Sequence, residues 1–300
     1  MPNWKQVLDE IQKESQAPGA VDKVRRKYLA ALHKYTKRNI ILYYSGWLQG
    51  SGQVPVQALI FDGDINSFMA SIHGMDVSKG LDLILHTPGG LTTATEAIVN
   101  YLRSKFGTDI RCFVPQLAMS GGTMIACSCK EIFMGKQSSI GPIDPQFGNM
   151  AAIGVIDEFN RAAEEIKKNP ATIPLWQAVF SKIPPGFITE CQQAVELSAK
   201  LALEWLKTGM FYNQTDAEMC AKDVVKALNN HRDTKAHGRH ITPDQAAKIG
   251  LKIKMLEEDQ KLQDLVLTVH HACMHTFSQA GNLLKMVENH EGTGMFIRGK

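Results

Sequence analysis

Two glycine-containing turns, separated by about thirty residues, constrain the fold of this chain most. The first is Thr87-Pro-Gly-Gly90, after the apolar run 81–85, and the second is Ser120-Gly-Gly122, after the apolar run 110–114. A segment with helical periodicity follows each turn. Strands that alternate with helices through short glycine turns predict a mostly parallel sheet with right-handed crossovers, which is an α/β fold.

The hydrophobic periodicity also predicts the organisation of the whole chain. We expect residues 1–37 to form an N-terminal arm of two helices, broken at residues 17–20. Residues 38–255 are predicted to form one α/β domain that carries a helical insertion at about 153–214. A polar loop is expected at 231–240. Residues 256–300 are predicted to be a C-terminal helical tail, with one or two amphipathic helices over 257–288.

Composition excludes several classes of function. The formal net charge of +3 is small for 300 residues, and basic residues are not interleaved with aromatic ones, so we expect no nucleic-acid partner. The sequence has no uninterrupted apolar run of about 18 residues, so we expect no membrane span. It begins without a basic and then apolar signal pattern, which favours a cytoplasmic protein.

Metal binding is not expected from any of the residue pairs that have suitable side chains. The six cysteines are irregularly spaced, which also argues against a disulfide framework. A turn and a helix N-cap explain Asp62 and Asp64. His271 and His275 lie on one helix face, but no glutamate accompanies them at metalloprotease spacing. We therefore expect no metal and no cofactor. The pairs considered are Cys127 and Cys129, Asp62 and Asp64, and His271 and His275.

The two turns together predict a site for nucleophilic catalysis. A serine between a strand and a helix has an exposed side chain, and the next backbone N–H points towards the substrate oxygen. Ser120 has this position, and Gly121 supplies that N–H group. Gly90, in the neighbouring turn, is placed to supply a second N–H donor. Two such donors form an oxyanion hole.

Three segments of the sequence resemble a known family: His86-Thr-Pro-Gly-Gly90, Ala118-Met-Ser-Gly-Gly-Thr123 and Ser139-Ile-Gly-Pro-Ile-Asp-Pro-Gln146. They resemble the serine dehydrogenase proteinase family, a distant relative of the Clp protease proteolytic subunit and of signal peptide peptidase A. The resemblance covers roughly residues 38–255. It implies a Clp/crotonase fold of repeated ββα units, with this region as the catalytic domain of a serine peptidase.

The resemblance also implies an acid and a base, in an unusual order. The position that carries the catalytic histidine in the Clp pattern is occupied here by Asp144. The region that matches the Clp aspartate contains His237 and His240 instead. A triad is defined by geometry and not by chain order, so Ser120, Asp144 and one of these histidines form a workable set. We favour His237, because Gly238 beside it permits an unusual backbone.

Two other bases remain open. The pattern of signal peptide peptidase A suggests a serine–lysine dyad, and Lys167 and Lys168 have the appropriate separation from Ser120. They lie, however, in what reads as a solvated helix end, whereas a lysine base must be desolvated. His86 precedes the first turn, where we expect it to pack under the turn. Asp144 itself also has a simpler interpretation, as a turn residue before Pro145.

Three functions are therefore considered. The first is a serine peptidase that acts on peptide or protein substrates. The second is a crotonase-type enzyme that holds an acyl-CoA enolate with the same two N–H donors, and the third is a catalytically silent oligomeric scaffold. Relatives with this fold assemble as rings, so we expect a homo-oligomer with contacts from the N- and C-terminal helices. A regulatory or unfoldase partner is left open.

Overall fold

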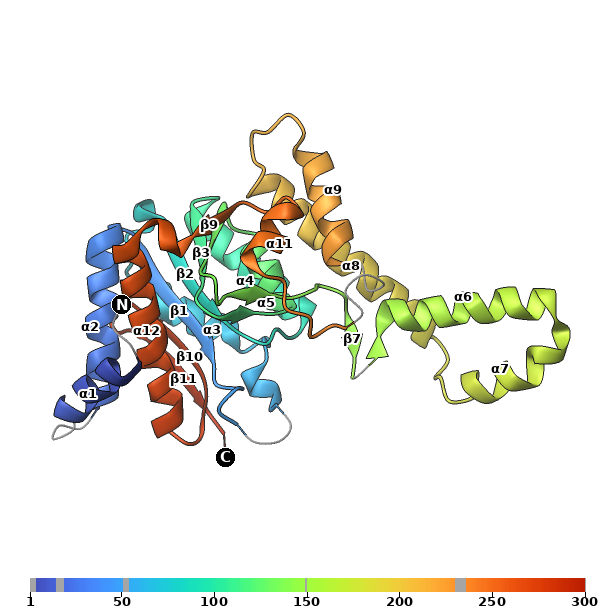
Figure 1. Ribbon diagram of the computed structural model, residues 1–300, viewed down its shortest axis with the longest axis horizontal. Coiled ribbons are helices and arrows are strands. Elements are labelled where there is room, and N and C mark those ends of the chain that lie inside the picture. The colour runs from blue at the N-terminus through green and yellow to red at the C-terminus, as the bar shows by residue number, and fades with distance from the viewer. Residues whose placement is uncertain (1–3, 15–18, 51–53, 149, 230–235, 300) are drawn as a thin grey trace.

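A seven-stranded sheet organises the molecule (Figure 1). The computed structural model describes residues 4–14, 19–50, 54–148, 150–229 and 236–299. Strand order is β11-β10-β1-β2-β3-β5-β9; β1, β2, β3, β5 and β9 are parallel, and the β10–β11 hairpin adds antiparallel to β1. The predicted, mostly parallel α/β sheet is thus confirmed. The strands of the sheet are β1 (Asn39–Ser45), β2 (Leu81–His86), β3 (Ile110–Val114), β5 (Glu131–Met134), β9 (Ile253–Met255), β10 (Leu283–Asn289) and β11 (Gly294–Arg298).

Helices cover both faces of the sheet. Helices α2 and α12 pack on one face, and α3, α4, α5 and α8 pack on the other, where α9 adds further core residues. The helices are α1 (Trp4–Glu14), α2 (Ala20–Thr36), α3 (Asp64–Ile72), α4 (Thr92–Phe106), α5 (Gly121–Cys127), α6 (Ala152–Lys168), α7 (Ile173–Phe180), α8 (Phe187–Thr208), α9 (Ala217–Leu228), α11 (Pro243–Lys248) and α12 (Gln260–Gln279). Single 3₁₀ turns lie at Val56–Ala58, Val77–Lys79, Pro170–Thr172 and Leu256–Glu258.

The strands are buried on both sides, as expected for a parallel sheet between helices. Ile41 and Tyr43 of β1 face the α3 and α4 layer, whereas Ile40, Leu42 and Tyr44 face the α2 and α12 layer. This alternation follows from the two-residue period of a strand. It means that polar groups on these strands must find partners inside the molecule.

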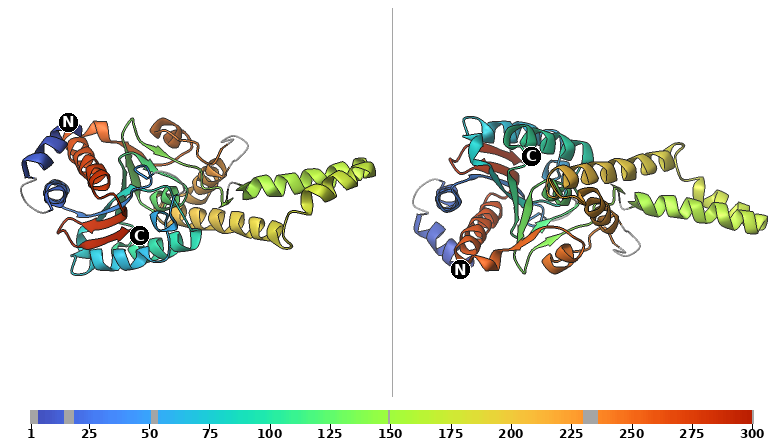
Figure 2. Two further views of the ribbon diagram at one scale, coloured as in Figure 1. Left: turned by 90° about the horizontal axis from the view of Figure 1, so that it is seen from below. Right: turned by 90° about the horizontal axis from the view of Figure 1, so that it is seen from above.

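A helical arm projects from the sheet region (Figures 1 and 2). It contains α6 and α7, and α8 leads back to the body. Two short pairs, β7 (Gln146–Phe147) with β8 (Met150–Ala151) and β4 (Leu117–Ala118) with β6 (Ser139–Ile140), lie outside the main sheet. Parts of two expected segments, the break at 17–20 and the loop at 231–240, lie outside the described residues.

The expected helical tail is wrong beyond residue 279. Helix α12 ends at Gln279, and residues 283–298 form the β10–β11 hairpin, which pairs with β1. The misleading signal came from Lys285 and Glu288, whose three-residue spacing suggests a polar helix face. Both side chains are instead completely buried in the sheet, each in an ion pair.

One of these ion pairs joins the hairpin to α2. Arg25 Nε lies 2.7 Å from one carboxylate oxygen of Glu288, and both side chains are fully buried. The other oxygen accepts from Arg26 Nε at 2.7 Å, and Arg25 also donates to the Thr276 hydroxyl. Removing one member of such a pair leaves an uncompensated buried charge, which typically costs about 3–5 kcal/mol.

His86, at the end of β2, packs in the layer between the sheet and α12. Its ring lies against Tyr44, Trp47 and His270, and both ring nitrogens are buried. Burial lowers the pKa of His86 to about 3, and it also holds the pKa of His270 well below its usual value. Both histidines are therefore neutral inside the folded protein.

These shifts predict acid sensitivity. The unfolded chain binds a proton at His86 near pH 6.5, whereas the folded chain does so only near pH 3. The free energy of unfolding therefore has its full value above pH 6.5 and decreases as the pH falls from there towards 3. At pH 5, His86 alone lowers it by about 2 kcal/mol. In thermal unfolding, His86→Phe should weaken the dependence of the midpoint temperature on pH between 7 and 5. The exposed control His73→Phe should leave this dependence unchanged. An unchanged profile in His86→Phe would contradict this account.

Candidate active site

Ser120 occupies a strained turn between β4 and α5. Its backbone angles are φ 50° and ψ −115°, which a residue with a side chain rarely adopts. Such conformations cost about 1–3 kcal/mol and persist where the surroundings enforce them. Here Thr123 helps, because its hydroxyl lies 2.8 Å from the Ala118 carbonyl oxygen and accepts from the Gly141 N–H at 3.0 Å. The side chain of Ser120 is left partly exposed.

The first glycine turn runs directly beside Ser120. The Thr87 N–H donates to Leu117 O, and the Met119 N–H donates to Thr87 O, so the turn continues the pairing of β4. Gly89 has φ 98°, and a Cβ atom there would lie 2.7 Å from the Ser120 Cβ. Only glycine allows both this conformation and this approach.

The segment around Ile60 lies on the other side of the same turn. Its N–H donates to Gly89 O at 2.8 Å, and its carbonyl accepts from the Leu91 N–H at 2.9 Å. A Cβ atom on Gly90 would lie 2.3 Å from the backbone nitrogen and oxygen of Ile60. Gly90 is thus enclosed by backbone, and in a strand-like pairing its own N–H points away from Ile60.

Two backbone N–H groups, those of Gly90 and Gly121, meet next to Ser120. A Cβ atom on Gly121 would lie 3.5 Å from Gly90 N, and one on Gly89 would lie 3.0 Å from Gly121 N. Within the described ranges, neither N–H donates to another group of the protein. Two adjacent donors without an acceptor, beside a serine, have the arrangement of an oxyanion hole.

Asp144 and His237 form a hydrogen-bonded pair at the site, although 93 residues separate them. His237 Nδ1 lies 2.9 Å from Asp144 Oδ1. The other carboxylate oxygen accepts from Gln146 Nε2 at 2.8 Å. Asp144 is buried, whereas the His237 side chain is 29% exposed. The carboxylate therefore holds the imidazole through Nδ1 and leaves Nε2 for chemistry.

A row of three paired segments places this dyad relative to the serine. Ala118 of β4 pairs with Ile140 of β6 in parallel, and Ile140 forms an antiparallel bridge with Ile241. The Ile140–Ile241 bridge is made by two hydrogen bonds, of 2.8 and 3.1 Å. The three backbones are therefore fixed side by side at this row.

All three site residues lie on the same side of this row of paired segments. The chain reaches Ser120 two residues after the β4 position and Asp144 four residues after the β6 position. His237 lies four residues before Ile241. Because the segment of Ile241 runs antiparallel to β6, these four residues extend in the same spatial direction. The topology thus brings the serine, the aspartate and the histidine to one end of the row.

The other candidate bases are Lys168, His240 and His86. Lys168 is exposed at the end of α6, in the arm that projects from the sheet region (Figure 1), whereas a lysine base must be desolvated. His240 is exposed. His86 packs in the α12 layer, as expected. The Trp4 ring packs on His275, and no group of three metal-binding side chains occurs among the described residues.

Sequence reasoning missed two supporting residues. Gln146 belongs to the motif at residues 139–146, where the sequence suggested no role for it, and its side-chain amide donates to the second carboxylate oxygen of Asp144. Thr123 also stood in a motif, and its hydroxyl joins the Ser120 turn to the segment that leads to Asp144. The available signal was a polar side chain close in sequence to each site residue, Thr123 after Ser120 and Gln146 after Asp144.

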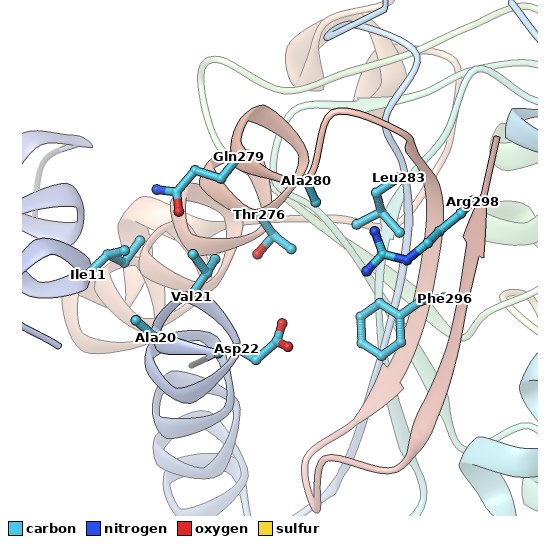
Figure 3. A pocket seen from close by; sticks show the side chains of 11 residues that line it. Ile11, Ala20, Val21, Asp22, Thr276, Gln279, Ala280, Leu283, Phe296 and Arg298 are labelled. Atoms are coloured by element: carbon cyan, nitrogen blue, oxygen red, sulfur yellow. The ribbon is translucent and has the colours of Figure 1, made fainter. Parts of the chain in front are cut away.

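A hollow of about 610 Å³ lies apart from this site, between α2, α12 and the β10–β11 hairpin (Figure 3). Asp22 and Arg298 face it from opposite sides, with Phe296 and Leu283 on the strand side. It is built from N- and C-terminal elements, so it does not provide the cleft at Ser120.

Comparison with known proteins agrees with the geometry. Residues 23–275 match the model of a family described as ClpP-like SDH-type serine proteinase. Two relatives from Methanocaldococcus jannaschii are the uncharacterized proteins MJ0137, 29% identical over 200 residues, and MJ1495, 35% identical over 201 residues. Each alignment covers 67% of this chain, and 62% and 61% of the relatives, so this chain spans less than two thirds of their length.

The family match covers most of the chain and includes Ser120, Asp144, His237 and both glycine turns. It confirms the resemblance seen in the sequence and, with the parallel sheet, the Clp/crotonase-type fold. The chain therefore belongs to the ClpP-like, SDH-type serine proteinases.

Proposed function

We propose that the protein hydrolyses peptide bonds through an acyl-enzyme on Ser120. The observation that carries this proposal is the Asp144–His237 pair at the same end of the three-segment row as a strained serine. Family membership supports a serine peptidase as the general class. Peptide or protein segments are the proposed substrates, and the reaction needs no cofactor.

Each proposed step uses a group that the fold supplies. His237 Nε2 takes the proton of Ser120 Oγ as the oxygen attacks the scissile carbonyl carbon. The resulting oxyanion accepts hydrogen bonds from the N–H groups of Gly90 and Gly121, each worth about 10²–10³ in rate. Asp144 orients the ring and stabilises the imidazolium.

Collapse of this intermediate completes the first half-reaction. The imidazolium gives its proton to the leaving amine as the C–N bond breaks, which leaves an ester on Ser120. Water then attacks the ester with His237 as base, and the carboxylate product and free serine result. An acyl-CoA enolate would use the same two N–H donors but would give no role to Ser120.

Substitution of the three residues tests the mechanism. In labelling by a fluorophosphonate probe, Ser120→Ala should lose the adduct completely. Asp144→Asn and His237→Ala should slow labelling by roughly 10³–10⁴, because the serine keeps its proton. His240→Ala and Lys168→Ala are matched controls and should label at the normal rate. Absence of a Ser120 adduct in the unaltered protein would favour the acyl-CoA or scaffold functions.

The turn itself can be tested with a pair of glycines. Gly89→Ala should reduce labelling at least about 100-fold, because the new methyl group displaces the turn that carries a donor. Gly107 also has positive φ, 60°, but open space around it. Gly107→Ala should therefore carry a similar backbone strain and leave labelling unchanged. Equal loss in the two variants would contradict the proposed role of the turn.

We further propose that the protein assembles as a homo-oligomer and works in the cytoplasm, with an unfoldase or other regulatory partner left open. Support comes from the arm, where Phe159, Ile173, Leu175 and Val179 are between 36% and 64% exposed. The N- and C-terminal helices, which we expected at the contact, pack on each other and on the sheet. In the described part of the chain, no helix is long and apolar enough to span a membrane.

Light scattering tests the assembly. At micromolar concentration the mass should be a multiple of 33.2 kDa. Leu175→Glu should shift it towards the monomer, because burying the new carboxylate in a contact is costly. Val77→Glu alters an exposed apolar residue away from the arm and should leave the mass unchanged. A monomer in the unaltered protein would contradict the proposal.

A further inference from the structure

Lys285 is a fully buried cation in β10, beside Ser45 of β1. Its Nζ lies 2.7 Å from both carboxylate oxygens of Asp64 and donates to the Leu59 carbonyl oxygen at 2.5 Å. The ring of Phe61 lies 4.5 Å from the same Nζ. This one ammonium group therefore contacts three residues of the segment 59–64, which joins the end of β1 to α3.

Two neighbouring contacts fix the same segment. Asp64 accepts from the Tyr43 hydroxyl at 2.6 Å and from the Phe61 N–H at 3.1 Å. The Ser45 hydroxyl donates to Ala58 O at 2.7 Å. Side chains of β1, β10 and α3 thus bind backbone atoms of Ala58, Leu59 and Phe61, on both sides of Ile60.

The fixed segment is the one that encloses the first glycine turn. Ile60 exchanges two backbone hydrogen bonds with that turn, and its backbone leaves no room for a Cβ atom on Gly90. A shift of Ile60 would therefore displace Gly90 and its N–H group. Contacts are continuous from Lys285 to the edge of the site.

The energetics indicate that stability alone does not explain this pair. Burial lowers the pKa of Lys285 to about 8 although Asp64 acts to raise it, and burial also raises the pKa of Asp64. Desolvation thus outweighs the attraction at both groups. Apolar residues of similar volume often serve stability equally well at such positions, so the hydrogen bonds to Leu59 and Phe61 offer a separate reason for the pair.

We propose that Lys285, together with Asp64, is a positioning residue that sets the Gly90 N–H of the oxyanion hole through the segment 58–61. This inference rests on the proposed function of Gly90. It extends the active-site machinery to the C-terminal hairpin, which lies beyond residue 275, where the family match ends. Neither residue touches the substrate in this account.

The test uses a double variant that leaves no unpaired charge. Lys285→Met with Asp64→Asn removes the ammonium contact to Leu59 and keeps an oxygen for the Phe61 N–H. The matched control is Arg25→Met with Glu288→Gln, which neutralises the other fully buried pair of the same hairpin. For each protein, the inactivation rate constant and the binding constant of a fluorophosphonate are measured separately, with the thermal midpoint.

We expect the Lys285/Asp64 variant to lose about tenfold or more in the inactivation rate constant, with little change in the binding constant. The control should label normally even where its thermal midpoint falls. A normal rate in the Lys285/Asp64 variant, or an equal loss in both, would overturn the positioning role.

Hydrogen exchange provides a readout that does not depend on activity. Amides of residues 58–61 and 89–91 should exchange faster in the Lys285/Asp64 variant than in the unaltered protein and the control. If the unaltered protein formed no Ser120 adduct, the proposed function would fail, yet this exchange pattern would still test the structural link. Unchanged exchange in both segments would refute it.

Discussion

The close approach of two backbones, at residues 87–90 and 118–121, is the constraint on which the site depends. Gly89 and Ser120 are so near that a methyl group on the glycine would overlap the serine side chain. Ser120 has a positive φ at this contact, and the N–H groups of Gly90 and Gly121 lie side by side there. The sheet places β2 beside β3, so both turns leave neighbouring strands at the same edge.

The proposed triad has a different chain order from the Clp pattern, because a fold supplies positions and not residue types. The segment after β6 and the segment before α11 extend to the same side of the Ile140–Ile241 bridge, with opposite chain directions. An acid on one and a base on the other is equivalent to the reverse arrangement. The triad that we propose is Ser120, Asp144 and His237, a geometric arrangement that does not depend on chain order.

Local signals predicted the parallel core well. The strand Ile110–Val114 and the starts of α4 and α5 agree with the sequence expectation, because apolar runs and glycine turns coincide there. The hairpin at 283–298 could not be predicted, because Lys285 and Glu288 are buried charges. Hydrophobic periodicity predicts that charged residues lie at the surface. The sequence also named two histidines and could not choose between them by contact. That choice depends on a pairing between Ile140 and Ile241, a hundred residues apart.

A crystal structure of the protein after reaction with a fluorophosphonate tests the central claim most directly. The account predicts phosphorus bonded to Ser120 Oγ and a phosphoryl oxygen about 3 Å from the nitrogens of both Gly90 and Gly121. It also predicts His237, still paired with Asp144, within hydrogen-bonding distance of the adduct. A phosphoryl oxygen directed away from the two glycines, or another side chain in the position of the base, would contradict it.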